Sequence, residues 1–166
     1  MPGDNDRLLD RDRLRQAVVV SSIGALRLVA EDDELVRIEW LRRPADGRAS
    51  PTSPVLREAG AQLAAYFDGR LTRFDLPLRP QGSRYQRMVW AFIHDIPHGD
   101  TLTYGEIGKL TGSFARTVAR TCGENPLPIV IPCHRVLAAN GKTGGYSGGE
   151  GVRTKHDLLR LERVWL

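Results

Sequence analysis

The first third of the chain alternates short apolar runs with polar turns. Residues 17–21, 25–30 and 35–41 are rich in Val, Ile and Leu, and they are separated by Gly24 and by the acidic run 31–34. Apolar runs of this length that end in turn residues are typical of β-strands. The segment 22–26 suits the turn of a hairpin. The pattern therefore predicts three strands, followed by a loop over residues 42–52, where Pro, Gly and Ser gather.

Helical spacing replaces the strand pattern from residue 54 onward. Apolar residues recur at helical spacing between Val55 and Phe67, and the run ends at Asp68-Gly69. This periodicity predicts a helix over residues 54–67. The next segment, 70–82, contains Pro77 and is expected to be an extended linker.

The second half of the chain shows helical spacing over most of its length. Ser83 is the expected N-cap of a helix that runs through residue 96, with apolar side chains at spacing four. A turn follows at residues 97–100. Thr103 and Glu106 then have the spacing of a capping box, which predicts the start of a helix over residues 104–110.

A second short helix is predicted directly after the first. Gly112 ends the helix 104–110, and Ser113 is the expected cap of a helix over residues 114–122. Two short helices joined by a Gly-containing turn form a helix-turn-helix pattern. Helical spacing predicts that one face of the second helix is buried. This apolar face consists of Phe114, Val118 and Cys122.

The opposite face of that helix carries two arginines around a small residue, namely Arg116, Ala119 and Arg120. Guanidinium groups presented in this way suit contacts with phosphates or a groove of DNA. The alternative is a solvated cationic face on a purely structural helix. Charge adds to the first interpretation: residues 1–82 hold 13 Arg and 13 Asp plus Glu, whereas residues 83–166 hold 11 Lys plus Arg and 7 Asp plus Glu, so the whole net charge of +4 lies in the second half.

The end of the chain combines a turn, a glycine-rich loop and a last helix. Residues 136–142 are expected to form a hairpin because they contain the turn dipeptide Asn140-Gly141. Residues 144–149 are rich in glycine, which permits a close approach of the backbone to a ligand. A helix is predicted over residues 152–165, with Leu158, Leu161 and Trp165 facing the core.

Length and composition exclude several classes of protein. The chain has 166 residues, which suits one domain or two small ones, and the pattern favours two, residues 1–82 and residues 83–166. No apolar run is long enough to span a bilayer, and the charged start lacks the apolar core of a secretory signal. Two cysteines are too few for a disulfide framework and fit a reducing cytosol, so a cytoplasmic location is expected. No Cys/His spacing indicates a metal site.

The most informative stretch is residues 126–136, where prolines bracket an aliphatic run that ends in Cys133, His134 and Arg135. Prolines fix the local backbone, so Cys133 is expected at the end of a stiff, buried segment. A thiol becomes a nucleophile only as thiolate, and a neighbouring base or cation favours that form. A buried cysteine that acts only as a small hydrophobe is the alternative.

The sequence Ile-Pro-Cys-His-Arg-Val at 131–136 resembles the active-site motif of the O6-alkylguanine-DNA alkyltransferases, also called methylated-DNA–protein-cysteine methyltransferases. Further matches lie at 96–104, 22–26 and 65–69. The resemblance, to the bacterial single-chain type, implies an α+β fold. The first domain would be a small antiparallel sheet with a helix, of ribonuclease-H-like topology. The second would be mainly helical, with a winged-helix-like helix-turn-helix.

The resemblance also implies roles for individual residues. The proposed catalytic set is a Cys–water–His–Glu relay and a proton donor to guanine: Cys133, His134, Glu162 and Tyr104. Arg116 would fill the gap that a flipped nucleotide leaves in the duplex. The other residues expected to contact DNA or the base, or to brace the active-site turn, are Ala119, Arg120, Asn125, Arg135, Tyr146 and Ser147. Arg120 stands where the family usually has a small residue, and the loop 148–152 is slightly longer than in many relatives.

The implied activity is irreversible, stoichiometric transfer of an alkyl group from O6 of a flipped guanine to Cys133, with no cofactor and no metal. The expected partner is double-stranded DNA that carries O6-alkylguanine, with O4-alkylthymine as a second candidate lesion. The chain is expected to act as a monomer, and cooperative assembly on DNA stays open. Two alternatives remain: a DNA-binding protein that recognises alkyl lesions without repairing them, and a cysteine hydrolase that uses Cys133 and His134.

Overall fold

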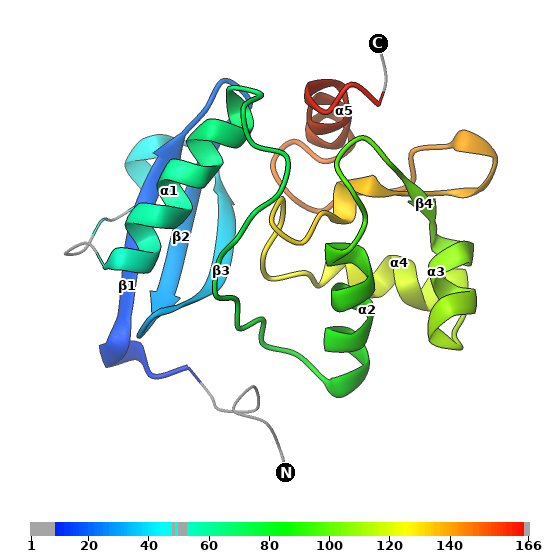
Figure 1. The fold of residues 1–166 in the computed structure, drawn as a ribbon, viewed down its shortest axis with the longest axis horizontal. Helices are drawn as coiled ribbons and strands as arrows, with labels where there is room; N and C mark the ends of the chain where they lie inside the picture. Colours follow the sequence, from blue (N-terminus) through cyan, green and yellow to red (C-terminus); the bar gives the residue numbers. More distant parts are fainter. Residues whose placement is uncertain (1–8, 48, 50–52, 165–166) are drawn as a thin grey trace. The chain divides into compact units, whose positions relative to one another are not determined.

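The computed structural model describes residues 9–47, 49 and 53–164. The chain divides into two compact units, residues 1–81 and 82–166 (Figure 1). Trp165, which was expected to face the core, lies outside the described residues. Within the described ranges, no helix is long and apolar enough to cross a membrane.

A three-stranded antiparallel sheet forms the body of the first unit. Its strands, in the order β1, β2 and β3, span Leu14–Val20, Ala25–Glu31 and Glu34–Leu41. The three predicted strands are therefore confirmed. Short 3-10 helices, η2 and η3, precede and follow the sheet at Arg11–Arg13 and Pro44–Asp46.

Helix α1, Pro54–Phe67, packs against all three strands of this sheet (Figure 1). Its bounds agree with the predicted helix. Ser53 caps it by accepting a hydrogen bond from the N–H of Leu56 (3.3 Å). The helix turns one face inward, and its buried side chains are Val55, Leu56, Ala59, Gln62, Leu63 and Tyr66.

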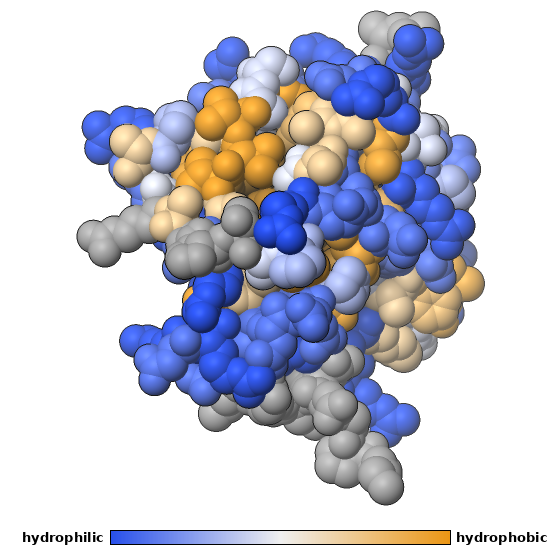
Figure 2. Space-filling model, turned by 60° about the vertical axis from the view of Figure 1, so that its left-hand side comes forward, coloured by the Kyte–Doolittle hydropathy of each residue, from blue (hydrophilic) through white to orange (hydrophobic). Residues whose placement is uncertain are grey.

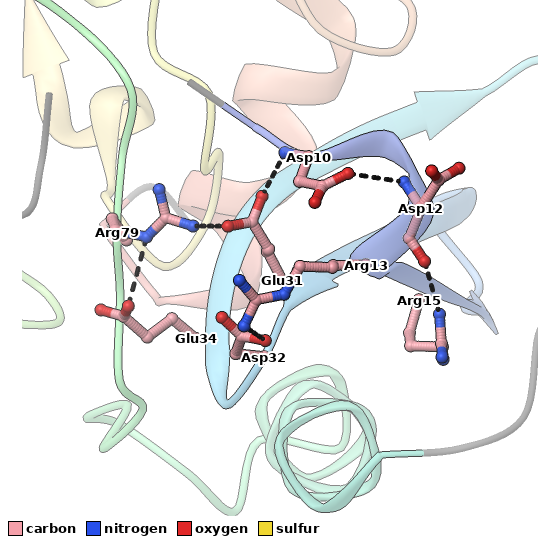
Figure 3. Close-up of polar contacts among 8 residues, drawn as sticks. All are labelled: Asp10, Asp12, Arg13, Arg15, Glu31, Asp32, Glu34 and Arg79. Carbon is pink, nitrogen blue, oxygen red and sulfur yellow. Dashed lines mark hydrogen bonds and ion pairs between the residues drawn. The ribbon is translucent and has the colours of Figure 1, made fainter. Parts of the chain in front are cut away.

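The segment after α1 returns to the free edge of β3. Leu35 donates its N–H to the carbonyl of Pro77 (2.8 Å), and Arg79 donates its N–H to the carbonyl of Leu35 (2.9 Å). The Arg79 side chain is 2% exposed, and its guanidinium donates to Glu31 (3.0 Å) and Glu34 (3.2 Å) (Figure 3). The predicted extended linker is thus fastened to the sheet by backbone hydrogen bonds and a buried ion pair.

The other edge of the sheet is less covered. β1 is half-buried along most of its length, and Val20 at its end is 66% exposed. Figure 2, which turns this side of the molecule forward, shows apolar residues (orange) at the surface among hydrophilic ones (blue). Because scattered apolar side chains are common on protein surfaces, this exposure does not by itself indicate a binding site.

The second unit is mainly helical. Its α-helices among the described residues are α2 (Arg84–His94), α3 (Tyr104–Thr111), α4 (Ala115–Gly123) and α5 (Val152–Leu161). A two-stranded parallel sheet joins β4 (Leu102–Thr103) to β5 (Val136–Leu137), and the 3-10 helices η4 and η5 span Cys133–Arg135 and Ala139–Gly141. Helices α2, α3 and α4 pack on one another (Figure 1). Trp90, which is 1% exposed, donates its indole N–H to the carbonyl of Thr121 (3.0 Å) and locks α2 against α4.

The helix-turn-helix is present, but its second helix starts later than predicted. The capping box of Thr103 and Glu106 is confirmed. Ser113 does not cap α4, because its hydroxyl is bound to the hydroxyls of Tyr85 (2.6 Å) and Thr111 (3.0 Å). Phe114 instead occupies the N-cap position with extended backbone (φ −101°, ψ 152°). Its ring therefore leaves the helical face on which it was expected and is 82% exposed, which corrects the prediction that it is buried.

The hairpin predicted over residues 136–142 is also wrong in its pairing. The turn itself forms, since Asn140 (φ 62°) and Gly141 (φ 73°) take the left-handed backbone that such turns require. Two backbone bonds close it, from the N–H of Ala138 to the carbonyl of Lys142 (2.8 Å) and from the N–H of Lys142 to the carbonyl of Ala139 (3.4 Å). Val136–Leu137 pairs with β4 in parallel, so tertiary packing rather than the local turn chooses the partner strand.

Candidate active site

Cys133 lies at the end of a tight, buried turn. Ile129 adopts φ 74°, a conformation that β-branched residues rarely take, and the N–H of Ile131 closes the turn on the carbonyl of Leu127 (2.8 Å). Cys133 donates its own N–H to the carbonyl of Ile131 (2.8 Å) and is 5% exposed. The stiff, buried setting predicted from the prolines is confirmed.

Asn125 braces this turn with every polar group of its side chain. Its amide nitrogen donates to the carbonyl of Ile131 (2.8 Å) and lies 3.1 Å from the Sγ of Cys133. Its amide oxygen accepts the N–H of Leu127 (2.9 Å). Because a donor at the sulfur stabilises negative charge there, Asn125 both fixes the turn and favours the thiolate of Cys133.

Behind the turn, three charged or titratable side chains are buried together. His134 is 0% exposed, and its Nε2 lies 2.6 Å from Oε2 of Glu162. Arg135 donates from Nε to Oε1 of Glu162 (2.6 Å) and from a terminal nitrogen to the carbonyl of Ile96 (2.6 Å). Glu162, at the end of α5, is therefore held between a histidine and an arginine.

The pKa directions indicate the protonation states of this group. Burial alone would raise the pKa of Glu162, but the hydrogen bonds and charges of His134 and Arg135 outweigh it and lower this pKa to about 2. Burial lowers the pKa of His134, although Glu162 opposes the shift. A neutral imidazole beside a carboxylate carries its proton on Nε2, which leaves Nδ1 as the basic atom. Within the described part of the chain, this Nδ1 has no hydrogen-bond partner.

The thiol of Cys133 needs such a base. Burial raises the pKa of Cys133 well above its usual range, and Cys122 adds to the increase. The amide of Asn125 and the ammonium of Lys155 act in the opposite direction. The resting sulfur is therefore a protonated thiol, and it becomes a nucleophile only when a proton is removed.

A pocket of about 350 Å³ opens over this sulfur. It receives residues from four separate parts of the unit: the start of α3, the second half of α4, the start of η4 and the glycine-rich loop. Ser147 fastens the loop to α4 by donating to the carbonyl of Gly123 (3.2 Å). The lining residues are Tyr104, Ala119, Cys122, Gly123, Cys133, Gly145, Tyr146 and Ser147.

Lys155 is a residue of this site that the sequence did not reveal. It is 0% exposed, and its ammonium donates to the carbonyls of Val136 (2.6 Å) and Gly145 (3.1 Å) and to the hydroxyl of Tyr104 (3.3 Å). Burial lowers the pKa of Lys155 to about 8. Burial also raises the pKa of Tyr104 to about 12, so the phenol keeps its proton at neutral pH. A lysine on an amphipathic helix is normally solvated, and only the tertiary structure shows this one beneath the pocket.

Gly144 makes the position of Tyr104 possible. Its φ is 72°, and a Cβ at this position would lie 2.7 Å from the Tyr104 ring and hydroxyl. The glycine-rich loop predicted to allow close approach does so here, because the backbone packs directly on an aromatic ring.

Helix α4 connects the pocket to the exposed surface. Ala119 lines the pocket, whereas Arg116 and Arg120 are exposed on the same helix. Arg120 lies 3.9 Å from the carboxylate of Glu124. The exposed cationic surface that the sequence predicted for this helix is therefore present.

Two expectations are corrected by these contacts. Arg135 was expected to contact DNA or the base, but its guanidinium is 6% exposed and is fully engaged inside the unit with Glu162 and Ile96. It positions Glu162 instead. Cys122 was expected in the core, yet it is half-buried and lines the pocket together with Cys133.

Comparisons with known proteins agree with this arrangement. Residues 84–164 match the family "6-O-methylguanine DNA methyltransferase, DNA binding domain", and residues 14–80 match its ribonuclease-like domain. The methylated-DNA–protein-cysteine methyltransferase of Mycolicibacterium paratuberculosis is 43% identical over 87% of this chain and 90% of its own length. The enzyme of that name from Methanosarcina acetivorans is 39% identical over 88% and 96%.

Solved structures give the same result. The O6-methylguanine methyltransferase of Mycobacterium tuberculosis superposes with a TM-score of 0.79 at 37% identity, covering 90% of this chain and 93% of its own. The structure of that organism's protein in complex with DNA superposes with a TM-score of 0.78 at 38% identity, covering 88% and 91%. The predicted α+β fold, with a ribonuclease-like first part and a helical DNA-binding part, is confirmed. The chain belongs to the 6-O-methylguanine DNA methyltransferase family.

Proposed function

We propose that this chain repairs DNA by direct reversal, moving an alkyl group from O6 of a flipped guanine to the Sγ of Cys133. The observation that carries the proposal is the setting of that sulfur. It faces a pocket of about 350 Å³ and follows a turn braced by Asn125. The next residue, His134, is buried and paired with Glu162. The relatives that carry the name of this activity are similar to this chain over most of their length.

The first step is removal of the thiol proton. Nδ1 of His134 is the unoccupied basic atom of the buried pair, and it takes the proton of Cys133 through a bridging water. Glu162 holds the imidazole by Nε2 and stabilises the imidazolium that forms. Arg135 keeps Glu162 ionised and in place, so its role is to position the base.

The second step is a single displacement. The thiolate attacks the alkyl carbon, the new S–C bond forms as the C–O6 bond breaks, and guanine leaves with the electron pair. Tyr104 supplies a proton to a ring nitrogen of the departing base, because its raised pKa keeps the phenol protonated beforehand. The Lys155 ammonium, 3.3 Å from that hydroxyl, stabilises the phenolate that results. The thioether is not reversed, so each chain acts once.

The DNA partner binds through the second unit, residues 82–166, which carries the whole net positive charge. Arg116 fills the gap in the duplex, and Arg120 contacts a phosphate. Ala119, Tyr146 and Ser147 line the pocket for the flipped guanine. Binding should weaken steeply with salt, because each neutralised phosphate releases counterions. We expect the chain to act as a monomer, with O4-alkylthymine as a second lesion to be tested.

The test is the intact mass of the protein after incubation with duplex DNA that contains one O6-methylguanine. The expected result is one added methyl group, mapped to Cys133 and saturating at one per chain, and no transfer by Cys133→Ser. Lesion-specific binding with no change in mass would favour a protein that only recognises damage. Repeated turnover would favour a hydrolase.

A further inference from the structure

The most exposed large apolar side chain in the described part of the chain is Phe114, at 82%. It stands at the N-cap of α4, the helix that lines the pocket through Ala119 and carries Arg116. Leu110, at the end of α3, is 58% exposed, so large apolar side chains are exposed on both sides of the helix-turn-helix turn. Exposure alone does not indicate a binding site, but this ring begins the same helix that carries Arg116 and lines the pocket.

The turn that presents Phe114 is rigid. The Ser113 hydroxyl is bound to Tyr85 (2.6 Å) and Thr111 (3.0 Å), and the carbonyl of Phe114 accepts the N–H of Val118 (3.1 Å). The backbone passes so close to Gly108 that a Cβ there would lie 2.8 Å from the Ser113 carbonyl. The braced backbone therefore fixes the point from which the exposed ring projects.

We propose that Phe114 is a wedge that stacks on the bases of the duplex next to the flipped nucleotide. The inference rests on the proposed function, and it adds a DNA contact made by stacking to those made by charge. Apolar side chains inserted between base steps are a known way to unstack and bend a duplex. The exposed guanidiniums of Arg116 and Arg120 on the same helix favour a polyanion over an apolar protein surface as the partner.

The position of the wedge relative to the pocket follows from helix geometry. Phe114 and Ala119 are five residues apart, which corresponds to roughly 7.5 Å along a helix axis. One base step along a strand is about 3.4 Å. With α4 laid along the strand, this separation corresponds to about two base steps from the nucleotide that enters the pocket.

The experiment compares Phe114→Ala with Phe114→Trp and with Phe92→Ala, which removes a ring that is 38% exposed on α2. Transfer rates are measured on duplex DNA with one O6-methylguanine and on the free base O6-benzylguanine. Phe114→Ala should lose about tenfold in rate at limiting duplex concentration, consistent with the loss of one base–aromatic stack. Its rate on the free base should stay unchanged, Phe114→Trp should restore the duplex rate, and Phe92→Ala should match the wild type on both substrates.

Two further readouts separate stacking from charge. The fluorescence of 2-aminopurine placed one or two steps from the lesion should rise on binding of the wild type and stay low with Phe114→Ala. The dependence of DNA affinity on salt should keep its slope in Phe114→Ala, because no counterion is released by a neutral ring.

Equal duplex rates for Phe114→Ala and the wild type would overturn the wedge, and so would equal losses on duplex and free base, which would indicate a structural role. Failure of the wild type itself to transfer an alkyl group would instead overturn the proposed function.

Discussion

Each unit buries a glutamate against an arginine, and in the second unit a histidine joins the pair. In the first unit Glu31 is held by the Arg79 guanidinium (3.0 Å) and by the N–H of Asp10 (2.7 Å) (Figure 3). In the second unit Glu162 is held by Arg135 (2.6 Å) and by the imidazole of His134 (2.6 Å). The ion pair of Glu31 is structural, because its other partner is a backbone N–H. The ion pair of Glu162 also orients a base, because its other partner is the imidazole of His134.

Comparing the two ion pairs separates their effect on folding stability from their effect on alkyl transfer. Both carboxylates are at most 2% exposed, so each ion pair has lost its hydration, and the gain from pairing roughly offsets that loss. Neutralising Glu162 leaves the buried guanidinium of Arg135 without its carboxylate, whereas neutralising Glu31 leaves Arg79 its ion pair with Glu34. Both sites should therefore lose stability when the glutamate is neutralised, the second more than the first, and only the second should lose alkyl transfer.

The largest effect is expected for Glu162→Gln. The amide cannot hold His134 as a base or stabilise its imidazolium, so the single-turnover rate on O6-methylguanine DNA should fall by about 100-fold or more. The buried Arg135 also loses its counter-ion, so the free energy of unfolding should drop by about 3 kcal/mol. Rapid quench of the transfer and urea unfolding measure the two quantities.

Glu31→Gln is the matched control for that variant. It should also lose stability, but less than Glu162→Gln, because Arg79 keeps its ion pair with Glu34 (3.2 Å). Its alkyl-transfer rate, measured where the variant is folded, should equal that of the wild type. A large loss of rate in Glu31→Gln would mean that both pairs act on activity through stability alone.

The pH dependence of the rate should sharpen the same contrast. Burial holds the pKa of His134 below its ordinary value of about 6.5, so the neutral base persists at pH 7 and the rate should fall only below pH ~6.5. Glu162 is the group that raises this pKa, so in Glu162→Gln the acid limb should move to lower pH. Rates from pH 5 to pH 8 test this, and a limb that moves upward in the variant contradicts it.

The free energy of unfolding should also fall as the pH is lowered. The folded-state pKa of His134 lies below the unfolded value, so the unfolded chain takes up this proton first as the pH falls. The contribution of the neutral histidine to stability is present above about pH 6.5 and is lost progressively below it. The lowered pKa of Glu162 gives a second loss in more acidic solution, between its ordinary value and about 2.

Much of this fold was predictable because its signals are local. The helix over residues 54–67 has the bounds of α1, and the capping box at Thr103 marks the start of α3. Phe114 was misplaced because the start of a helix depends on what its cap contacts, and Ser113 is engaged by Tyr85 and Thr111. The pairing of β5 with β4 joins residues over 30 positions apart, which no local pattern encodes.

The active-site residues also differ in how far local sequence predicts them. Cys133 was predicted from its proline-bracketed segment together with the motif, whereas Glu162 was assigned only by family resemblance, because a glutamate beside an apolar stripe is normally solvated. Lys155 was missed for the same reason. Its burial depends on three acceptors from separate segments, at Tyr104, Val136 and Gly145, which only the folded chain brings together.

A smaller loss of transfer rate is expected when the charge of Lys155 is removed. Lys155→Met keeps the length of the side chain but removes the charge beside Tyr104, so transfer should slow by about tenfold, the value of one charge-assisted hydrogen bond. In the wild type the rate should also decline above pH 8, where Lys155, whose pKa is about 8, loses its proton. That decline should be absent from the variant, and an alkaline limb that survives in Lys155→Met would assign it to another group.

The smallest effect tests shape rather than charge. Gly144 and Gly141 have nearly the same φ, 72° and 73°, but a Cβ at 144 would lie 2.7 Å from the Tyr104 ring, whereas one at 141 would meet nothing within 4 Å. Gly141→Ala should cost only the strain of a left-handed alanine, about 1 kcal/mol of unfolding free energy, with no change in transfer. Gly144→Ala adds displacement of Tyr104 to that strain, so its transfer rate should fall as well. Equal rates in the two variants would show that Tyr104 tolerates movement and that the charges of the second unit, rather than its close packing, limit the reaction.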